Sequence, residues 1–352
     1  METFLPDYLE RLYVLFFDPK KRLFLGYLMA AFLAAILVYV LAYREKPLAA
    51  VSRFFDRRVW LSPSARADYL MTVINQALML GLLPRLLSKM VVATLVFETL
   101  HLWLDGRVMV WQSAPGWALA TLFTLVLFLV DDASKYLLHR VLHKWPVLWA
   151  FHKVHHSAET LTPVTVLRTH PVEAVLFSLR ATLVQAVVTA GFIYFMGPRA
   201  ELVTVLGANA ILFVFNIAGS NLRHSHVWLS YGPVVERLLI SPAQHQIHHS
   251  IDVRHHDRNF GAVLAIWDWM GGSLCPAGPR QQLTFGTGPA ASASAHRLHS
   301  LYLLPFREAF ACLAAFIRKG LSTMPFHRIP FLSIGTAARR SLMGALVLLV
   351  LA

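Results

Sequence analysis

The sequence predicts an all-α integral membrane protein, in which a bundle of transmembrane helices carries a helical cap on its cytoplasmic side. Of the 352 residues, 57% are hydrophobic and only 14% are charged, which indicates a bilayer rather than water as the main surroundings. Several apolar runs approach the thickness of the hydrocarbon core. The net charge is +13, and basic residues cluster beside those runs, where they would meet anionic headgroups. This distribution does not indicate a nucleic-acid-binding face.

The first part of the chain, 1–116, is expected to anchor it in the membrane. An amphipathic, aromatic segment (1–22) leads into Leu23–Tyr43, a run long enough to span the hydrocarbon. Tyr69–Leu83 and Met90–Leu104 are shorter and are expected to pair as a helical hairpin. The N-terminus has acidic residues and no small-residue cleavage site before its basic cluster, so we expect no removable signal peptide.

The second part, 117–286, is expected to be a catalytic domain. Trp117–Val130 is apolar and continues without a breaker until Pro146, which predicts one long helix that leaves the membrane. Glu173–Met196 and Glu201–Asn221, joined by Gly197-Pro198, are expected to form a second hairpin. A hairpin returns to its starting side, so histidines before and after it should share one membrane face. Nearby Lys and Arg favour the cytoplasm for that face, although the basic loop 44–68 argues against it.

The third part, 287–352, changes character. It opens with a linker of small residues (Gly286–Ala295) and contains an amphipathic stretch, Ser300–Ile317. It ends in an apolar tail, Ser341–Ala352, that is too short to span a membrane alone.

Two near copies of one histidine motif dominate the second part: FHKVHH at Phe151–His156 and QHQIHH at Gln244–His249. Each places three imidazoles at i, i+3 and i+4, offsets that share one face of a helix and allow three side chains to converge on a single point. If the 17 His were placed at random, HxxHH would arise at roughly 1 in 10,000 positions, so chance explains the pair poorly. The spacing indicates metal ligands.

Ten imidazoles in four segments are candidate ligands, more than one metal ion can use, so we expect two ions. They are His139, His143, His152, His155, His156, His224, His226, His245, His248 and His249. Imidazole suits Fe, Zn and Cu, and composition does not choose among them. Only two cysteines are present, without a CxxC, which excludes a thiolate cluster and a disulfide framework.

Five further residues are candidates for orienting those ligands. Asp132 lies seven residues before His139, on roughly the same helix face, and could fix a ring tautomer or simply be an interfacial acid. Asn221 lies one turn before His224 and could reach the site through water. His170 could approach the site or start a helix before Pro171. His256 could orient a ligand or be solvated, and Asp257 beside it is a candidate carboxylate that could bind a ligand ring.

The combined motifs resemble the fatty acid hydroxylase / sterol desaturase superfamily of membrane di-iron oxygenases. In this chain they are Asp132–His143 (Asp-x(6)-HRxxH), His152–His156, Arg168–Glu173 (RTHPxE), Ser241–Ser250 (SPxxHQxHHS) and Asp257–Gly271 (DRNFGxxLxxWDWMG). The resemblance implies a cytoplasm-facing di-iron site above a bundle of membrane helices, and eight ligands in the HRxxH and HxxHH motifs. His224 fits the place of a further family ligand, whereas His226 stands where many members carry Asn.

The resemblance also implies an enzyme that uses O2 to hydroxylate, or desaturate, an unactivated C–H bond of a lipid such as a sterol or fatty acyl chain. The cofactor would be two Fe ions, although zinc could occupy the purified protein. Because the chain has no dinucleotide fingerprint and no iron–sulfur cysteine set, electrons would come from a separate protein of ferredoxin or cytochrome b5 type. The alternatives are a histidine-rich membrane protein that binds or transports zinc or copper, and a di-haem cytochrome with axial histidine pairs.

Overall fold

The computed structural model describes residues 4–82, 88–106, 108–111, 113–198, 201–288 and 296–319. Contacts divide the chain into two units, Met1–Cys312 and Leu313–Ala352. The first unit holds every candidate ligand and is described below. In the second, the described residues continue a helix that starts in the first.

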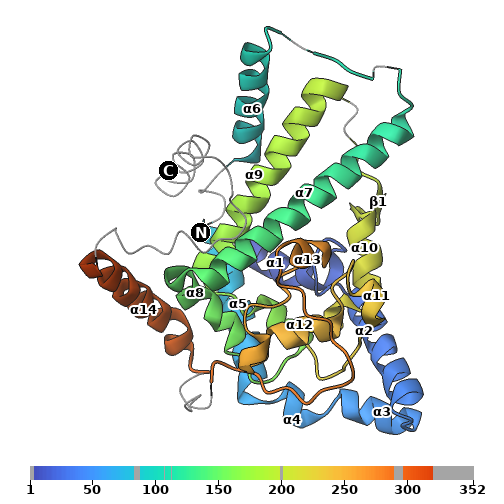
Figure 1. Ribbon diagram of the computed structural model, residues 1–352, viewed down its shortest axis with the longest axis vertical. Helices are drawn as coiled ribbons and strands as arrows, with labels where there is room; N and C mark the ends of the chain where they lie inside the picture. Colours follow the sequence, from blue (N-terminus) through green and yellow to red (C-terminus); the bar gives the residue numbers. More distant parts are fainter. Residues whose placement is uncertain are drawn as a thin grey trace. The chain divides into compact units, whose positions relative to one another are not determined.

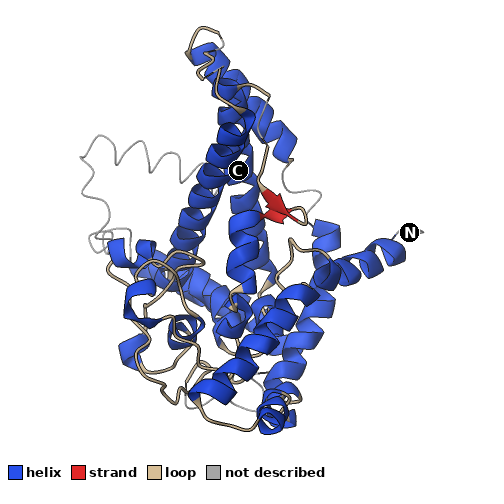
Figure 2. Ribbon diagram, turned by 90° about the vertical axis from the view of Figure 1, so that its right-hand side faces the viewer, coloured by secondary structure: helices blue, strands red, loops and turns tan. Residues whose placement is uncertain are grey.

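The described residues are mostly helical, as the sequence predicts (Figures 1 and 2). The longer helices are α1 (Phe4–Phe17), α2 (Leu25–Leu37), α5 (Pro63–Leu82), α6 (Lys89–Trp103), α7 (Gly116–Lys144), α9 (Pro171–Met196) and α14 (Leu298–Lys319). The shorter ones are α3 (Pro47–Phe54), α4 (Arg57–Trp60), α8 (Pro146–His156), α10 (Ala210–Ile217), α11 (Gly232–Val235), α12 (Pro242–His248) and α13 (Ile266–Met270). Single turns form the π-helix η1 (Val38–Ala42) and the 3-10 helices η3 (Pro163–Leu167), η4 (Ser220–Arg223) and η5 (Val253–His255). Strands β1 (Thr204–Val205) and β2 (Ala208–Asn209) pair antiparallel.

Three described helices are long and apolar enough to cross a membrane: Leu25–Ala42, which joins α2 to η1, and the helices α7 and α9. Helices α7 and α9 pack side by side, and α6 packs against α9 (Figure 1). Large apolar side chains on the spans lie on the protein surface; for example, Trp117 is 74% exposed. Lipid rather than water suits such a surface, so the fold is that of a membrane protein.

The long helix before Pro146 is confirmed. Helix α7 runs unbroken over 29 residues to Lys144, and Pro146 is the first residue of α8. Proline lacks the N–H of a helix interior but fits the first turn, so one residue ends α7 and begins α8. His139 and His143 therefore lie at the end of α7, next to the histidines of α8.

The expected second arm, Glu201–Asn221, is not a spanning helix. The chain instead forms the β1–β2 turn and then α10, which has only 8 residues. Leu206 and Gly207 adopt positive φ angles of 49° and 78° in the turn, and the Asn209 side chain accepts hydrogen bonds from the first N–H groups of α10. These turn and cap signals outweigh the apolar composition. The chain nevertheless returns to α8, since His224, the residue after η4, lies beside His155 of α8.

The first expected hairpin also differs from a pair of spans. Helix α5 starts at Pro63, earlier than predicted, and buries the polar side chains of Asp68, Thr72 and Asn75. It therefore packs within the protein. Helix α6 has 15 residues, fewer than the roughly 20 that a full crossing needs. Residues 83–87, between the two helices, lie outside the described residues.

A buried ion pair joins α5 to the segment that precedes α9. Arg168 Nη1 lies 2.8 Å from Asp68 Oδ1, and both side chains are fully buried. The same guanidinium donates to Val154 O and to Ser157 Oγ at the end of α8. Arg168 therefore fixes the position of α8 relative to α5.

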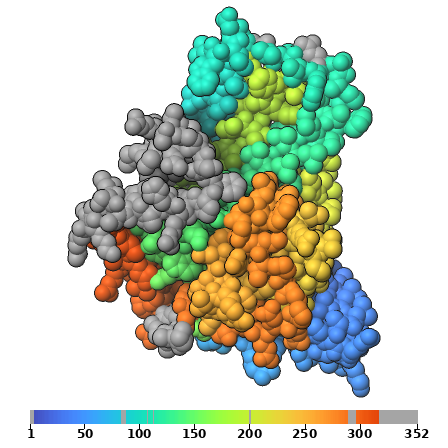
Figure 3. All heavy atoms as spheres, viewed as in Figure 1, coloured from blue at the N-terminus to red at the C-terminus, as the bar shows by residue number. Residues whose placement is uncertain are grey.

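The predicted amphipathic stretch is α14. Within the first unit it buries Leu301 against Met71 and Val154, and Ala309 against Ala150 and Phe151. Much of the preceding linker (289–295) and the whole apolar tail Ser341–Ala352 lie outside the described residues. The chain that follows α12, coloured orange, covers a broad part of the face seen in Figure 3.

Candidate metal centre

Nine of the ten candidate histidines gather into two groups of buried or half-buried side chains. In each group, one ligand atom per residue lies within 4.8 Å of all the others. Group 1 consists of His139, His143, His152, His156 and His248. Group 2 consists of His155, His224, His245 and His249. Helices α7, α8 and α12 and the loop after η4 supply them.

Each HxxHH motif divides between the two groups. In α8, His152 and His156 (i and i+4) join group 1, whereas His155 (i+3) joins group 2. In the second motif the assignment is reversed, because His248 joins group 1 and His245 and His249 join group 2. The expectation that three imidazoles converge on one point is therefore wrong. Positions i and i+4 lie about 40° apart around a helix, whereas i+3 points about 60° to the other side.

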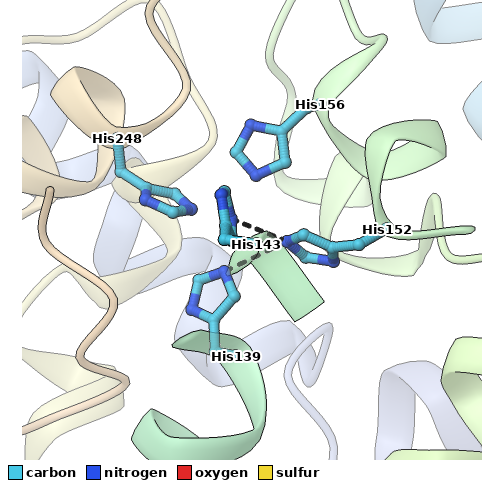
Figure 4. A group of neighbouring side chains, drawn as sticks. All are labelled: His139, His143, His152, His156 and His248. Carbon is cyan, nitrogen blue, oxygen red and sulfur yellow. Dashed lines mark hydrogen bonds between the residues drawn. The ribbon is translucent and has the colours of Figure 1, made fainter. Parts of the chain in front are cut away.

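In group 1, the Nε2 atom of His152 lies 3.1 Å from that of His139 and 3.1 Å from that of His143. Figure 4 shows the five rings of group 1 around a common space, with these two contacts dashed. Phe260 and Trp149 pack against the rings, with centroids 5.0 Å from that of His143. Apolar side chains thus border the group.

In group 2, His224 is central. Its Nε2 atom lies 3.0 Å from Nε2 of His245, 3.2 Å from that of His249 and 3.3 Å from that of His155. Gly219, with a φ of 92°, and the 3-10 turn η4 bring His224 to this position. All four side chains are buried.

The two groups adjoin each other. His156 of group 1 stacks on His249 of group 2, with ring centroids 4.4 Å apart and an interplanar angle of 22°. The neighbouring pairs His155–His156 and His248–His249 also link the groups. The arrangement is that of two adjacent sites and could hold two ions.

Three rings of group 1 are oriented through their Nδ1 atoms. His139 donates to Phe260 O at 2.8 Å, and His248 donates to Arg258 O at 2.7 Å. His152 donates to Glu173 Oε1 at 2.9 Å. A carbonyl oxygen can only accept, and so can the carboxylate of Glu173 when it is ionised. The three Nδ1 atoms then carry the proton and the Nε2 atoms carry lone pairs.

Burial keeps these rings neutral. It lowers the pKa of His155 to about 3, and it lowers the pKa values of His224, His245 and His249 well below 6.5, with a further contribution from neighbouring histidines. The same holds for His152, His156 and His248. The lone pairs of His139 and His152 therefore face each other across 3.1 Å without a proton between them.

A bound metal ion would accept these facing lone pairs. Two nitrogens about 2.1 Å from one ion, separated by an angle of about 90–110°, lie about 3.0–3.4 Å apart, which matches the observed spacings. In addition, the buried atoms Nε2 of His156 and His248 have no hydrogen-bond partner. Neutral, oriented imidazoles with unused lone pairs fit a divalent transition metal.

His226 is the candidate that the structure does not bring to either group. Its Nε2 atom lies 3.2 Å from Arg53 O, and its ring packs near Tyr39 and Phe54. The backbone bends from His224 to His226, so these two side chains need not reach the same ion.

The structure places Asp132 away from the imidazoles, so the expected contact with His139 is not present. Its carboxylate accepts hydrogen bonds from the N–H groups of Val263 and Leu264 and from the indole of Trp267. Seven residues correspond to about 10.5 Å along a helix, beyond the reach of a hydrogen bond to His139. Asn221 also has other partners, because its amide exchanges hydrogen bonds with Arg22.

The three remaining candidates have structural contacts. His170 caps α9, since its Nδ1 accepts from Val172 N, and its Nε2 contacts Tyr302 O, in agreement with the helix-start interpretation. His256 is exposed and contacts Ile251 O. Asp257 is exposed and pairs with Lys144. None of the three belongs to a histidine group.

Two other acidic residues, Glu173 and Asp268, orient the ligand rings of group 1. Glu173, in the RTHPxE motif, binds His152 directly. Asp268 accepts from the N–H groups of Phe260 and Gly261, and thereby positions the Phe260 carbonyl that binds His139. In the sequence, the signal for these two roles is that each acid lies inside a polar motif, Glu173 in Arg168–Glu173 and Asp268 in Asp257–Gly271.

Residues 124–273 match the family described as fatty acid hydroxylase. Human alkylglycerol monooxygenase is 28% identical over 214 residues, which cover 60% of this chain and 42% of the human protein. The Danio rerio alkylglycerol monooxygenase is 31% identical over 166 residues (47% and 32%), and the ornithine lipid hydroxylase of Rhizobium tropici is 27% identical over 174 residues (49% and 45%). The chain thus spans less than half the length of these relatives. No solved structure matches it significantly.

Proposed function

Residues 124–273 of this chain belong to the fatty acid hydroxylase family, and from this premise we propose that the protein is a membrane-bound di-iron oxygenase that hydroxylates a lipid. The observation that carries the proposal is the pair of adjoining groups built only from neutral imidazoles, whose Nε2 atoms face each other. Two ions and nine ligands suit redox chemistry with O2 better than a hydrolytic zinc site, which needs three ligands and an open position.

Iron, when bound in both groups, supplies the redox chemistry that activates O2 toward an unactivated C–H bond. The overall reaction takes a C–H bond, O2, two electrons and two protons to an alcohol and water. A separate protein of ferredoxin or cytochrome b5 type supplies the electrons. An acidic donor would suit the net charge of +13.

The residues of the chain hold this centre rigid and dry. Glu173, Phe260 O and Arg258 O orient three rings of group 1. Burial of the histidines and the packing of Phe260 and Trp149 limit the access of water. A desolvated, preorganised centre protects a strong oxidant from side reactions.

The substrate is a lipid that enters from the bilayer. Group 1 takes two ligands from the end of α7, a candidate span, and one orienting carboxylate from the first turn of α9, another candidate span. The centre therefore lies where apolar helices end, and we place that end on the cytoplasmic side. The names of the relatives, a monooxygenase and a lipid hydroxylase, support hydroxylation rather than desaturation.

The direct test is lipid mass spectrometry of cells with and without the full chain, together with O2 consumption by the purified, iron-loaded protein and a reducing donor. We expect lipids about 16 mass units heavier, the mass of one added oxygen. His155→Ala should abolish the product, whereas His226→Ala, outside both groups, should retain it. Absence of O2 uptake, or full activity of His155→Ala, would contradict the proposal, and tight zinc binding without oxygen uptake would support a zinc protein instead.

A further inference from the structure

Two arginines beside group 2 have hydrogen-bond donors that no described residue uses. Arg223 is only 5% exposed, and its Nε and Nη2 atoms are buried without a partner. Its guanidinium lies over the ring of Phe215, 5.0 Å from the centroid, and no carboxylate among the described residues forms an ion pair with it. Removing a cation from water without an anion is costly, so an unpaired buried guanidinium indicates a missing partner.

Arg22 lies close to Arg223. Its Nη2 donates to Ser220 O at 3.3 Å and to Asn221 Oδ1 at 3.2 Å, both in η4, while its Nε is buried without a partner. Burial and the charge of Arg223 lower the pKa of Arg22 to about 9, and burial lowers the pKa of Arg223 to about 10. Two like charges are thus held together, and an anion between them would relieve both the repulsion and the loss of solvation.

The pair is adjacent to the candidate metal centre. Arg223 directly precedes His224, the central residue of group 2. Arg22 donates to Ser220 O and Asn221 Oδ1, in the same turn η4 that ends at Arg223 and leads into His224. Both guanidiniums therefore lie on the turn that carries the central ligand of group 2.

The position of Arg22 indicates which anion is available. It closes the basic run Lys20-Lys21-Arg22 directly before the candidate span that begins at Leu25. Basic residues at the start of a span lie at the level of lipid headgroups. Guanidinium groups also bind phosphate and carboxylate oxygens through paired N–H donors.

We propose that Arg22 and Arg223 bind the anionic headgroup of a lipid, through its phosphate or carboxylate, beside group 2. This assignment rests on the proposed function in one respect: the lipid held there is the substrate. A headgroup bound next to His224 presents the part of the lipid nearest its headgroup to the metal centre. The arginine pair is then a determinant of substrate class and of the position hydroxylated.

The test is binding of a short-chain phosphatidic acid, below its micelle concentration, to the purified full chain in detergent, compared with the diacylglycerol of the same chains. The two lipids differ only in the phosphate. We expect Arg223→Gln and Arg22→Gln each to weaken phosphatidic acid binding roughly tenfold or more and to leave diacylglycerol binding unchanged. Arg223→Lys, which keeps the charge, should retain part of the affinity.

Arg58→Gln is the matched control, because Arg58 is an exposed arginine whose side chain is 91% accessible and which pairs with Asp56. It should bind phosphatidic acid as the wild type does. The thermal unfolding temperature checks folding: without lipid, Arg223→Gln should unfold no earlier than the wild type, because it removes an unpaired charge. If Arg223→Gln fails to fold, the binding of phosphatidic acid by Arg22→Gln decides whether the proposal holds.

Equal binding of the two lipids by the wild type, or undiminished binding of phosphatidic acid by the folded glutamine variants, would overturn the proposal. Inorganic phosphate is the third probe. If it binds as tightly as phosphatidic acid, the pair is a site for a free anion and the lipid assignment is overturned. Binding needs neither turnover nor a reductant, so a failed oxygenase assay and a failed binding assay are distinguishable.

Discussion

Glu173 Oε1 lies 2.9 Å from His152 Nδ1, and both side chains are almost fully buried, at 3% and 2% exposed. Glu173 belongs to the first turn of α9, whereas His152 belongs to α8. The hydrogen bond places the proton on Nδ1 and directs the Nε2 lone pair toward His139 and His143. The start of one candidate span thereby controls the orientation of a ligand in group 1.

Glu173→Ala is expected to weaken metal binding by group 1 about 10- to 100-fold, because His152 loses the partner that fixes its tautomer. Glu173→Gln keeps an acceptor oxygen and should have a smaller effect. The measurement is metal content after dialysis against a graded chelator. Exposed Glu201→Ala is the control and should load metal normally. A Glu173→Ala protein with unchanged metal affinity would show that the tautomer is fixed in another way.

The buried pair of Arg168 and Asp68 predicts a stability effect rather than an effect on the chemistry. Arg168→Met leaves the Asp68 carboxylate buried without its cation and should lower the free energy of unfolding by about 3–5 kcal/mol. Thermal unfolding in detergent is the measurement. Arg254→Met removes an exposed pair, with 82% of the arginine side chain accessible, and should leave the free energy of unfolding nearly unchanged. Equal shifts in the two variants would contradict this prediction.

Local rules predicted the elements next to the centre well. The uninterrupted apolar run and Pro146 determined the end of α7 and the start of α8, and both features act within a few residues of the chain. The gathering of nine candidate histidines followed from their spacing, since imidazoles at i, i+3 and i+4 rarely occur twice in one chain by chance.

The parts that the sequence did not predict depend on contacts between distant segments. The helical offsets separate position i+3 from i and i+4. Which imidazoles of the two motifs share a group follows from the approach of α12 to α8, which no local pattern encodes. The helix face of Asp132 allowed either a contact with His139 or the role of an interfacial acid. Its carboxylate instead binds the N–H groups of Val263 and Leu264, far along the chain. For Glu201–Asn221, apolar composition suggested a span, and the turn at Leu206-Gly207 prevented it.

Asp268 is buried and Asp257 is exposed, so replacing each with Asn should affect stability and metal retention differently. Asp268→Asn leaves only one oxygen for the N–H groups of Phe260 and Gly261 and places an amide NH2 near one of them. We expect a loss of about 1–3 kcal/mol in the free energy of unfolding and weaker metal retention, because Phe260 O orients His139. Asp257→Asn changes an exposed carboxylate and should have little effect on either. Chemical unfolding with metal analysis checks both; comparable losses would argue against the assignment.

His224 and His226 lie two residues apart and test the boundary of group 2. His224→Ala should remove about one ion per chain, because its Nε2 atom is central to the group. His226→Ala should leave the metal content unchanged, since its ring contacts Tyr39 and Phe54 instead. Metal analysis of the two purified variants is sufficient. Equal metal loss from both would mean that His226 reaches the ion in the loaded protein.

The stability of the metal-free protein should depend on pH in one direction. Burial lowers the folded-state pKa of His155 to about 3 and lowers those of His156, His245 and His249 well below 6.5, the value expected in the unfolded chain. Below about pH 6.5 the unfolded state therefore binds protons that the folded state does not bind, so acid favours unfolding. Each such histidine lowers the free energy of unfolding by up to about 1.4 kcal/mol per pH unit, until its folded-state pKa is reached.

Unfolding temperatures of chelator-treated protein should thus be nearly constant above about pH 7 and fall steeply between about pH 6.5 and 5. His256→Gln, which changes an exposed histidine outside both groups, should follow the same curve. His155→Phe replaces a buried imidazole with an aromatic ring that cannot be protonated and should flatten the fall. A curve for His155→Phe as steep as that of the wild type would show that His155 does not contribute to the acid sensitivity, and that the remaining histidines account for it.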